Sequence, residues 1–192
     1  MSGWLGFEID TDQLHALIDE LGLTERQAKF ALSRALRRTA TTLRVMSERG
    51  LKSELDVRKL TYLRRRLRFS RMNRGNFEGA RLWFGTGDMP ISALRGRIAE
   101  TGDGAAFSGK AGSQSYAGGF VAKSKRGWTA NRKTIFARKG GKRLPIAEAQ
   151  LPVQDTMDVF IEDQVFDQVD RIFWNHFERD MMARARGFGR RE

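Results

Sequence analysis

The chain has 192 residues, of which 40% are hydrophobic, and its 35 basic and 23 acidic side chains give a net charge of +12. This composition supports a hydrophobic core, excludes global disorder, and predicts a nucleic acid or an acidic protein as partner. The absence of cysteine excludes disulfides and thiolate metal sites, and no apolar run reaches the ~18 residues that a membrane span needs.

The chain opens with two predicted helices. Apolar side chains at helical spacing predict a first helix over 11–21, which Gly22 ends. Residues 24–27 (Thr-Glu-Arg-Gln) form a capping box, in which the hydroxyl and the amide side chain satisfy each other's backbone N–H groups. A long helix should follow to about Glu48, with small alanines on its apolar stripe and with Gly50 marking its break.

A third, shorter helix is expected from an N-cap at Asp56 to Leu67, which makes 11–70 a helical region. This helix and its extension carry a block of basic residues that no acid interrupts. The block has two interpretations, contacts to DNA phosphates or to acidic side chains of neighbouring subunits, and the sequence does not choose between them. Its members are Arg58, Lys59, Arg64, Arg65, Arg66, Arg68, Arg71 and Arg74.

From about Asn76 the hydrophobic period changes from near 3.6 to near 2, which predicts a β-rich region over 76–152. Ala80, Leu82 and Phe84 should share one face of a strand, and another extended segment is expected near 91–98. Residues 102–119 contain six glycines and three serines. We expect this stretch to be a flexible loop, because it buries too little apolar surface to offset its ordering entropy.

Strands are expected again at 120–123, near Trp128, at 134–138 and at 143–149, joined by glycine-containing turns at 124–127 and 139–142. This hairpin region forms a second basic surface with the same two interpretations. Its basic residues are Lys123, Lys125, Arg126, Arg132, Lys133, Arg138, Lys139, Lys142 and Arg143.

After Pro152, the region 153–186 should be one long helix, with an apolar stripe that runs from Met157 to Met181. A helix of this length is too long to be covered by one small sheet. We therefore expect it to pack along the helix that begins at Thr24 or against another subunit. The candidate subunit-interface residues are Phe160, Ile161, Val165, Val169, Ile172, Phe173 and Phe177.

No pattern of catalytic chemistry is present in the sequence. Residues 104–111 match the phosphate-binding loop except at Ala111, where a hydroxyl would have to hold magnesium, so we interpret them as a glycine-rich loop. His15 and His176 lack the partners and spacing of a zinc site, and no nucleophile accompanies a histidine and an acid. We predict that the chain is not an enzyme and binds no cofactor or metal. The N-terminus lacks the features of a signal peptide, so we expect the chain to be made inside the cell.

The order of several short motifs resembles the prophage minor tail protein Z family. The resemblance covers roughly residues 28–165, and its strongest part is the run of strand motifs after the glycine-rich stretch. The matching segments are Ala31-Leu32-Ser33-Arg34-Ala35, Val57-Arg58-Lys59-Leu60, Asp88-Met89-Pro90-Ile91-Ser92-Ala93-Leu94, Gly119-Phe120-Val121, Ile135-Phe136-Ala137-Arg138-Lys139-Gly140, Arg143-Leu144-Pro145-Ile146 and Leu151-Pro152-Val153.

This resemblance implies a structural virion protein of the tail completion type, assembled in the host cytoplasm and placed at the head-proximal end of the phage tail. It would form a homo-oligomeric ring, hexameric by family analogy, contact other tail and neck proteins, and help to join tail and head, with DNA in the tail lumen as a further partner. The alternatives are a free-standing, sequence-independent nucleic-acid-binding protein and an enzyme with an unfamiliar site. The predicted fold is a single α+β domain with N-terminal helices, a small antiparallel sheet with long loops, and a long C-terminal helix.

Overall fold

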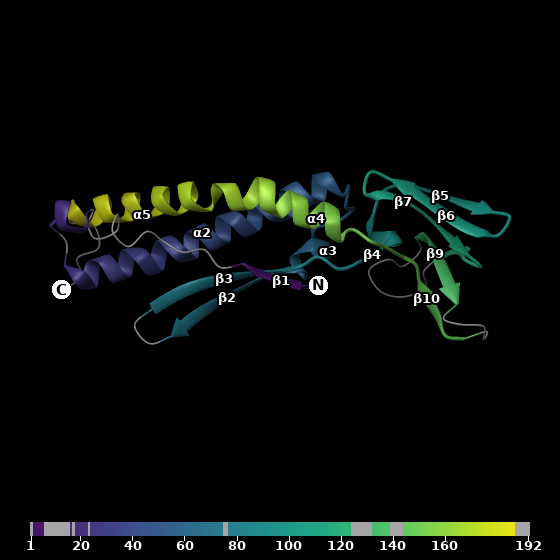
Figure 1. Cartoon of the computed structure of the whole chain (residues 1–192), viewed down its shortest axis with the longest axis horizontal. Helices are drawn as coiled ribbons and strands as arrows, with labels where there is room; N and C mark the ends of the chain where they lie inside the picture. Colours follow the sequence, from purple (N-terminus) through teal and green to yellow (C-terminus); the bar gives the residue numbers. More distant parts are fainter. Residues whose placement is uncertain are drawn as a thin grey trace. The chain divides into compact units, whose positions relative to one another are not determined.

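The computed structural model describes residues 2–5, 16, 18–22, 24–74, 77–123, 132–138 and 144–186, with backbone alone for 2–5, 25, 69–74 and 77–81. Contacts divide the chain into two compact units. The sheet unit comprises Met1–Ser2, Glu48–Arg66 and Gly85–Ile161, and the helix-pair unit comprises Gly3–Ser47, Leu67–Phe84 and Glu162–Glu192. That the two units form the single domain expected from the chain length stays a prediction. The predicted α+β class is confirmed, because helices accompany small antiparallel sheets (Figure 1).

The long helix α2 (Glu25–Glu54) begins as the capping box predicts. The Thr24 N–H donates to Gln27 Oε1 at 3.0 Å, and the Gln27 N–H donates to the Thr24 hydroxyl at 3.4 Å. The predicted end near Glu48 is wrong, because α2 continues through Gly50. A Cβ at Gly50 would lie 2.1 Å from Cζ of Phe160, so this glycine permits a close approach and does not break the helix.

The third predicted helix is much shorter than expected. Asp56 does not cap it but takes a positive φ of 48°, and Val57 forms an antiparallel bridge with Leu94 that holds the chain extended. Helix α3 covers only Leu60–Arg64, with Lys59 as its N-cap.

The predicted helical region to residue 70 therefore ends early. Strand β2 (Leu67–Arg74) pairs antiparallel with β3 (Phe77–Gly85), and β1 (Ser2–Leu5) completes the sheet in the order β1-β3-β2. Leu82 and Phe84 are both buried, as the alternating pattern predicts.

The final helical segment is continuous but changes its winding. It consists of α4 (Gln154–Phe160), the π-helical turn η3 (Ile161–Val165), the 3-10 turn η4 (Phe166–Gln168) and α5 (Val169–Ala185). The buried side chains recur every four residues, which in a pure α-helix would drift by about 40° per step. A π turn has more residues per turn and counters this drift. The buried series is Met157, Ile161, Val165, Val169, Phe173, Phe177 and Met181.

In the helix-pair unit, α5 packs along α2 (Figure 1), as one of the two predicted arrangements requires. The alanines of α2 let the aromatic side chains of α5 approach closely, and the rings of Phe173 and Phe177 stack with centroids 5.7 Å apart. The buried cluster consists of Ala31, Ala35, Leu36, Phe173, Phe177 and Met181.

The sheet unit contains three small antiparallel sheets. Strands β5 (Arg97–Thr101), β6 (Gly104–Gly109) and β7 (Gly112–Ala117) form a meander, and β8 (Phe120–Lys123), β9 (Lys133–Arg138) and β10 (Ile146–Glu148) pair in the order β10-β9-β8. The short strands β4 (Met89–Pro90) and β11 (Gln150–Leu151) pair with each other, and the 3-10 turn η1 (Ile91–Ala93) follows β4. The predicted turns at 124–127 and 139–142, and Trp128, lie outside the described residues.

The prediction of a loop over 102–119 is wrong, because β6 and β7 occupy this stretch. Ala105 and Phe107 alternate inward from β6 and are buried, which gives the sheet an apolar face. The glycines serve the turns and the close packing: Gly112 has a φ of 133°, and a Cβ at Gly109 would lie 2.6 Å from the carbonyl oxygen of Arg95.

Two polar side chains tie the sheets of this unit together. The Tyr116 hydroxyl on β7 donates to the carbonyl of Gln150 at 2.8 Å, and burial, with a smaller contribution from Asp88, raises the pKa of Tyr116 to about 12. The carboxylate of Glu148 accepts from the Ser92 N–H at 2.9 Å and from the Thr134 hydroxyl at 2.7 Å. In the described part of the chain, no helix has both the length and the apolar character that a membrane span requires.

Candidate functional site

The first basic block is divided between α3 and β2, and part of it holds the fold. Arg58 Nε donates to the carbonyl of Leu94 at 2.8 Å. Arg64 Nε donates to Glu48 Oε2 at 3.2 Å, and this carboxylate is buried. Glu48 on α2 therefore supplies a negative charge beside the block, although no acidic residue lies within the block in the sequence.

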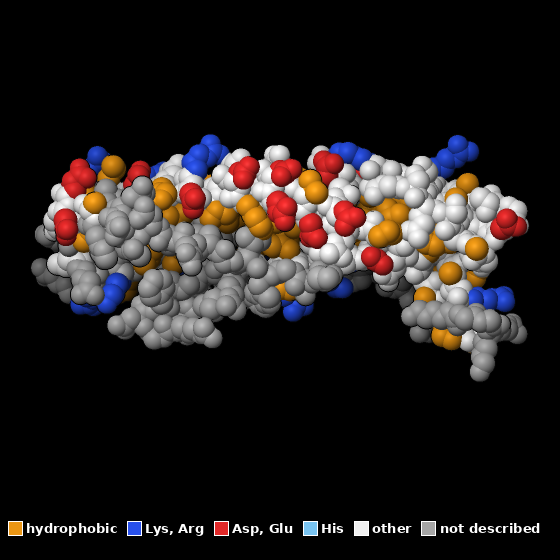
Figure 2. All heavy atoms as spheres, in the orientation of Figure 1, with side chains coloured by type: hydrophobic (Ala, Val, Ile, Leu, Met, Phe, Trp, Pro, Cys, Tyr) orange, Lys and Arg blue, Asp and Glu red, His pale blue; other side chains and the backbone are white. Residues whose placement is uncertain are grey.

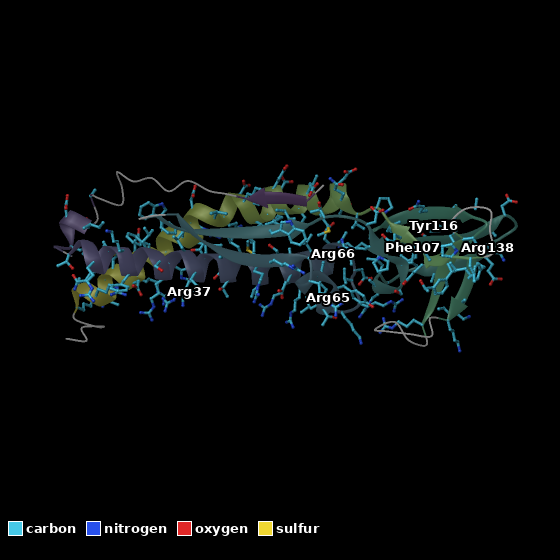
Figure 3. All side chains as sticks on the ribbon, turned by 90° about the horizontal axis from the view of Figure 1, so that it is seen from below. Arg37, Arg65, Arg66, Phe107, Tyr116 and Arg138 are labelled. Carbon is cyan, nitrogen blue, oxygen red and sulfur yellow. The ribbon has the colours of Figure 1, made fainter. Side chains whose placement is uncertain are left out.

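Arg66 is the most enclosed of the block's members whose side chains are described. Its guanidinium donates to the carbonyl of Gly85 at 3.3 Å and to the carbonyls of Gly87 and Asp88 at shorter distances. Burial lowers the pKa of Arg66, and Asp88 partly opposes this shift. The Arg66 side chain thus holds the segment that follows β3 through three hydrogen bonds. Arg65, in contrast, is exposed and projects away from the ribbon (Figure 3).

The remaining members are less constrained or lie outside the description. The Arg68 guanidinium lies 5.9 Å from the ring centroid of Trp83, within cation–π range. Lys59 is exposed, and its side chain makes no cap hydrogen bond. For Arg71 and Arg74 only the backbone of β2 is described.

We expect Arg66→Gln to lower the free energy of unfolding by about 1–3 kcal/mol, because the partly buried bond to Gly85 and the exposed bonds to Gly87 and Asp88 lose a charged donor that glutamine cannot replace at the same reach. Urea denaturation followed by circular dichroism measures this change. Lys59→Gln, which removes an exposed charge nearby, is the matched control and should stay within about 0.5 kcal/mol of the parent. Equal stabilities of the two variants would show that the hydrogen bonds of Arg66 to this segment do not stabilise the fold.

The second basic region lies on β8, β9 and the segments beside them. Lys123 and Lys133 are directly opposite each other in the β8–β9 pair, and both are exposed. Arg138 is exposed at the end of β9 (Figure 3), and Arg132 is half-buried. Other predicted members lie outside the described residues: Lys125, Arg126, Lys139, Lys142 and Arg143.

The predicted interface stripe is covered by the chain itself. Ile161, Val165, Val169, Phe173 and Phe177 are buried, while Phe160 and Ile172 are half-buried. This packing accounts for the hydrophobicity of the stripe without a second subunit.

A basic cavity of about 630 Å³, which none of the sequence patterns predicts, lies in the helix-pair unit. The α2 side of the cavity carries two arginines four residues apart, and the α5 side carries the other lining residues. The charged and titratable lining residues are Arg34, Arg38, His176, Arg179, Asp180 and Arg184. In the sequence, Arg34 and Arg38 stand one helical turn apart, which indicates one side of the cavity but not the other.

Asp180 is the single acid of this cavity and is buried. Its carboxylate accepts from Arg184 Nε at 2.8 Å and pairs with Arg34 Nη1 at 3.6 Å. His176 Nε2 lies 3.2 Å from the Thr42 hydroxyl. Burial lowers the pKa of His176, and the charges of Arg38 and Arg179 lower it further.

The residues singled out for other chemistry have structural partners. Lys110, the lysine of the phosphate-loop-like motif at 104–111, donates to the carbonyl of Ser53 at 2.8 Å and pairs with Glu54 at 3.6 Å. Among the described residues, no group of three or more His, Asp or Glu side chains is arranged to hold a metal ion.

Comparison with protein families gives one result that covers nearly the whole chain. The family model described as Prophage minor tail protein Z (GPZ) matches residues 18–190, which includes parts of both units. Comparisons with curated proteins and with solved structures gave no significant match. Because the family match extends far beyond half of the 192 residues, the chain belongs to the prophage minor tail protein Z family, and it is a phage minor tail protein.

Proposed function

We propose that this minor tail protein completes the tail at its head-proximal end and prepares it for joining to the head. The observation that supports the proposal is the family match over residues 18–190, which leaves little of the chain for an unrelated activity. Its partners are then the other tail and neck proteins, and its place is in the virion.

We further propose that copies of the chain form a ring, with six members by family analogy. The distribution of charge supports self-association. Exposed acidic side chains follow one another along α4, η3 and η4 with no basic residue among them (Figure 2), and they continue into α5, where basic residues alternate with them. Helix α2, in contrast, carries eight basic and three acidic residues. Surfaces of opposite charge favour a head-to-tail contact between copies. The acidic series is Asp155, Glu162, Asp163, Asp167, Asp170 and Glu178.

The exposed basic residues that do not hold the fold are the proposed contacts to DNA or to acidic partners. They include Lys59 on the α3 side and Lys123, Lys133 and Arg138 in the strand region. Substituting Arg64, Arg65 and Arg66 together would not test this idea, because Arg64 and Arg66 make contacts within the subunit. The triple variant Lys123→Gln, Lys133→Gln and Arg138→Gln leaves those contacts intact and is expected to reduce head–tail joining.

The deciding experiment deletes the coding sequence from an inducible prophage and examines the lysate by electron microscopy. We expect filled heads beside unattached tails, and we expect the purified protein, added to the lysate, to restore joined particles. A gold-labelled antibody against the chain should mark the head-proximal end of the tail. Normal virions from the deletion strain, or label at the distal end, would overturn the proposal.

A further inference from the structure

The arginine-lined cavity of the helix-pair unit has an excess of positive charge that its own residues do not neutralise. Four guanidinium groups face a single carboxylate, so three positive charges remain while His176 is neutral. Arg34 and Arg184 already serve Asp180. Within the described part of the chain, Arg38 and Arg179 have neither a hydrogen-bond nor an ion-pair partner, and both are exposed. Two guanidinium forks are therefore available for an anion from outside.

The two free arginines come from different helices and meet at one place. Both lie close enough to His176 to lower the pKa of its imidazole. The positive charges of the two arginines therefore act on the same part of the cavity. The packing of α2 against α5 holds the two sides of the cavity together, since the buried aromatic cluster fixes this helix pair. The two helix backbones that carry these arginines are therefore held in place before an anion binds.

We infer that this cavity binds a phosphate group through Arg38 and Arg179, with His176 as an additional donor when it is protonated. Phosphoryl oxygens fit the planar fork of arginine and accept several charge-assisted hydrogen bonds at once. Asp180 already pairs with Arg34 and Arg184, so the remaining positive charge belongs to Arg38 and Arg179. The cavity volume of about 630 Å³ has room for an anion larger and more highly charged than a carboxylate.

The source of the phosphate is either a free phosphate compound or the backbone of DNA, and both have the same phosphoryl chemistry. The inference concerns this cavity alone and does not depend on the proposed position of the protein in the tail. Failure of one therefore leaves the other standing.

Binding should also depend on pH through His176. Thr42 and Arg38 on α2 and Arg179 on α5 act directly on its imidazole, and the other charged groups of the same cavity are Arg34 on α2 and Asp180 and Arg184 on α5. In the free protein the pKa of His176 lies below its ordinary value, so the imidazole is neutral at pH 7. A bound anion favours the protonated form and raises this pKa, and by linkage the anion binds more tightly as the pH falls toward that value.

The test uses the full chain and reads His176 directly. The chain has only two histidines, so the His15→Gln variant leaves one imidazole signal in the proton NMR spectrum. This signal is titrated with pH in the absence and presence of inorganic pyrophosphate. We expect saturating pyrophosphate to raise the pKa of His176 by about one unit. We also expect the double substitution Arg38→Gln and Arg179→Gln to weaken pyrophosphate binding by roughly tenfold or more.

Arg37→Gln is the matched control, because it removes the same charge from the neighbouring position of α2. Arg37 is exposed on the outside of the helix (Figure 3) and does not line the cavity. We expect a less than twofold change in affinity for this variant, and circular dichroism should show unchanged melting for all variants. If Arg37→Gln weakens binding as much as the double substitution, the anion is held by general surface charge and the cavity proposal is overturned.

A second arm replaces pyrophosphate by a 20-base-pair DNA duplex without terminal phosphates. If the double substitution weakens DNA binding more than Arg37→Gln does, the cavity takes the DNA backbone. The affinity should then fall with salt at a log–log slope of about −0.9 per phosphate neutralised. Binding of pyrophosphate without DNA assigns the cavity to a free phosphate compound. No effect of either probe on the His176 signal overturns the inference.

Discussion

Phe177→Ala is expected to lower the free energy of unfolding by about 3–5 kcal/mol, because it removes a fully buried ring from the core of the helix pair. The ring stacks on Phe173 and meets Trp174 edge-on at 5.9 Å between centroids, so its removal leaves a cavity among these aromatic side chains. Urea denaturation followed by circular dichroism at the helix band measures the loss.

Phe30→Ala is the control for this prediction. Phe30 belongs to the same unit, but its side chain is 54% exposed, and its ring makes cation–π contacts with the guanidinium groups of Arg26 and Arg184, at 5.8 and 5.9 Å from the ring centroid. Its loss should cost less than about 1 kcal/mol. A small effect of Phe177→Ala, comparable to that of Phe30→Ala, would mean that α5 is not packed on α2 and that its apolar face is open to another subunit.

The same burial changes how assembly can be tested. Aspartate at Phe173 and Phe177 would place charges in the core, so a failure to enter tails would report unfolding and not a lost interface. The exposed acids of the same segment are better probes. Asp163→Asn together with Asp167→Asn leaves the core intact while removing part of the acidic series.

The two long helical segments could be predicted because their information is local. The capping box at Thr24, the stripe from Met157 to Met181 and the alanines of the long helix all act within a few residues or along one face. The end of α2 could not be predicted, because Gly50 is explained by the Phe160 ring, more than one hundred residues away in the sequence. The π turn η3 could not be predicted either, because it depends on which side of the helix its buried side chains face in the folded chain.

The candidate sites were less predictable for a related reason. A sequence shows how many charges lie in a block, but their partners come from elsewhere in the chain: Glu48 for Arg64, and the carbonyls from Gly85 to Asp88 for Arg66. The arginine cavity joins residues that are about 140 positions apart, so its two sides appear in the sequence as two unremarked helix faces.

The glycine-rich stretch illustrates the limit of composition most clearly. Glycine loses more conformational entropy on folding than other residues, so glycine-rich segments are often flexible. It is also the residue that tight strand turns and close backbone contacts require. Composition cannot separate these roles. The alternation of Ala105 and Phe107 was the signal of a strand, and a stretch rich in glycine and serine obscured it.

Gly104→Ala is expected to destabilise the chain by about 4 kcal/mol, which combines backbone strain with overpacking. Gly104 begins β6 with a φ of 157°, and a Cβ there would lie 2.2 Å from the carbonyl oxygen of Tyr116 on the paired strand. That oxygen belongs to the backbone and cannot rotate away, so β6 and β7 would have to separate. Thermal unfolding followed by circular dichroism measures the loss.

Gly102→Ala is the matched control, because it makes the same substitution two residues earlier, where a Cβ meets no atom within 4 Å. It should change the free energy of unfolding by less than about 0.5 kcal/mol. A free loop would tolerate both substitutions equally, since neither side chain would meet a fixed backbone. The difference between the two variants therefore measures whether residues 102–119 form the β5-β6-β7 meander in solution, and equal stabilities would restore the loop that their composition predicts.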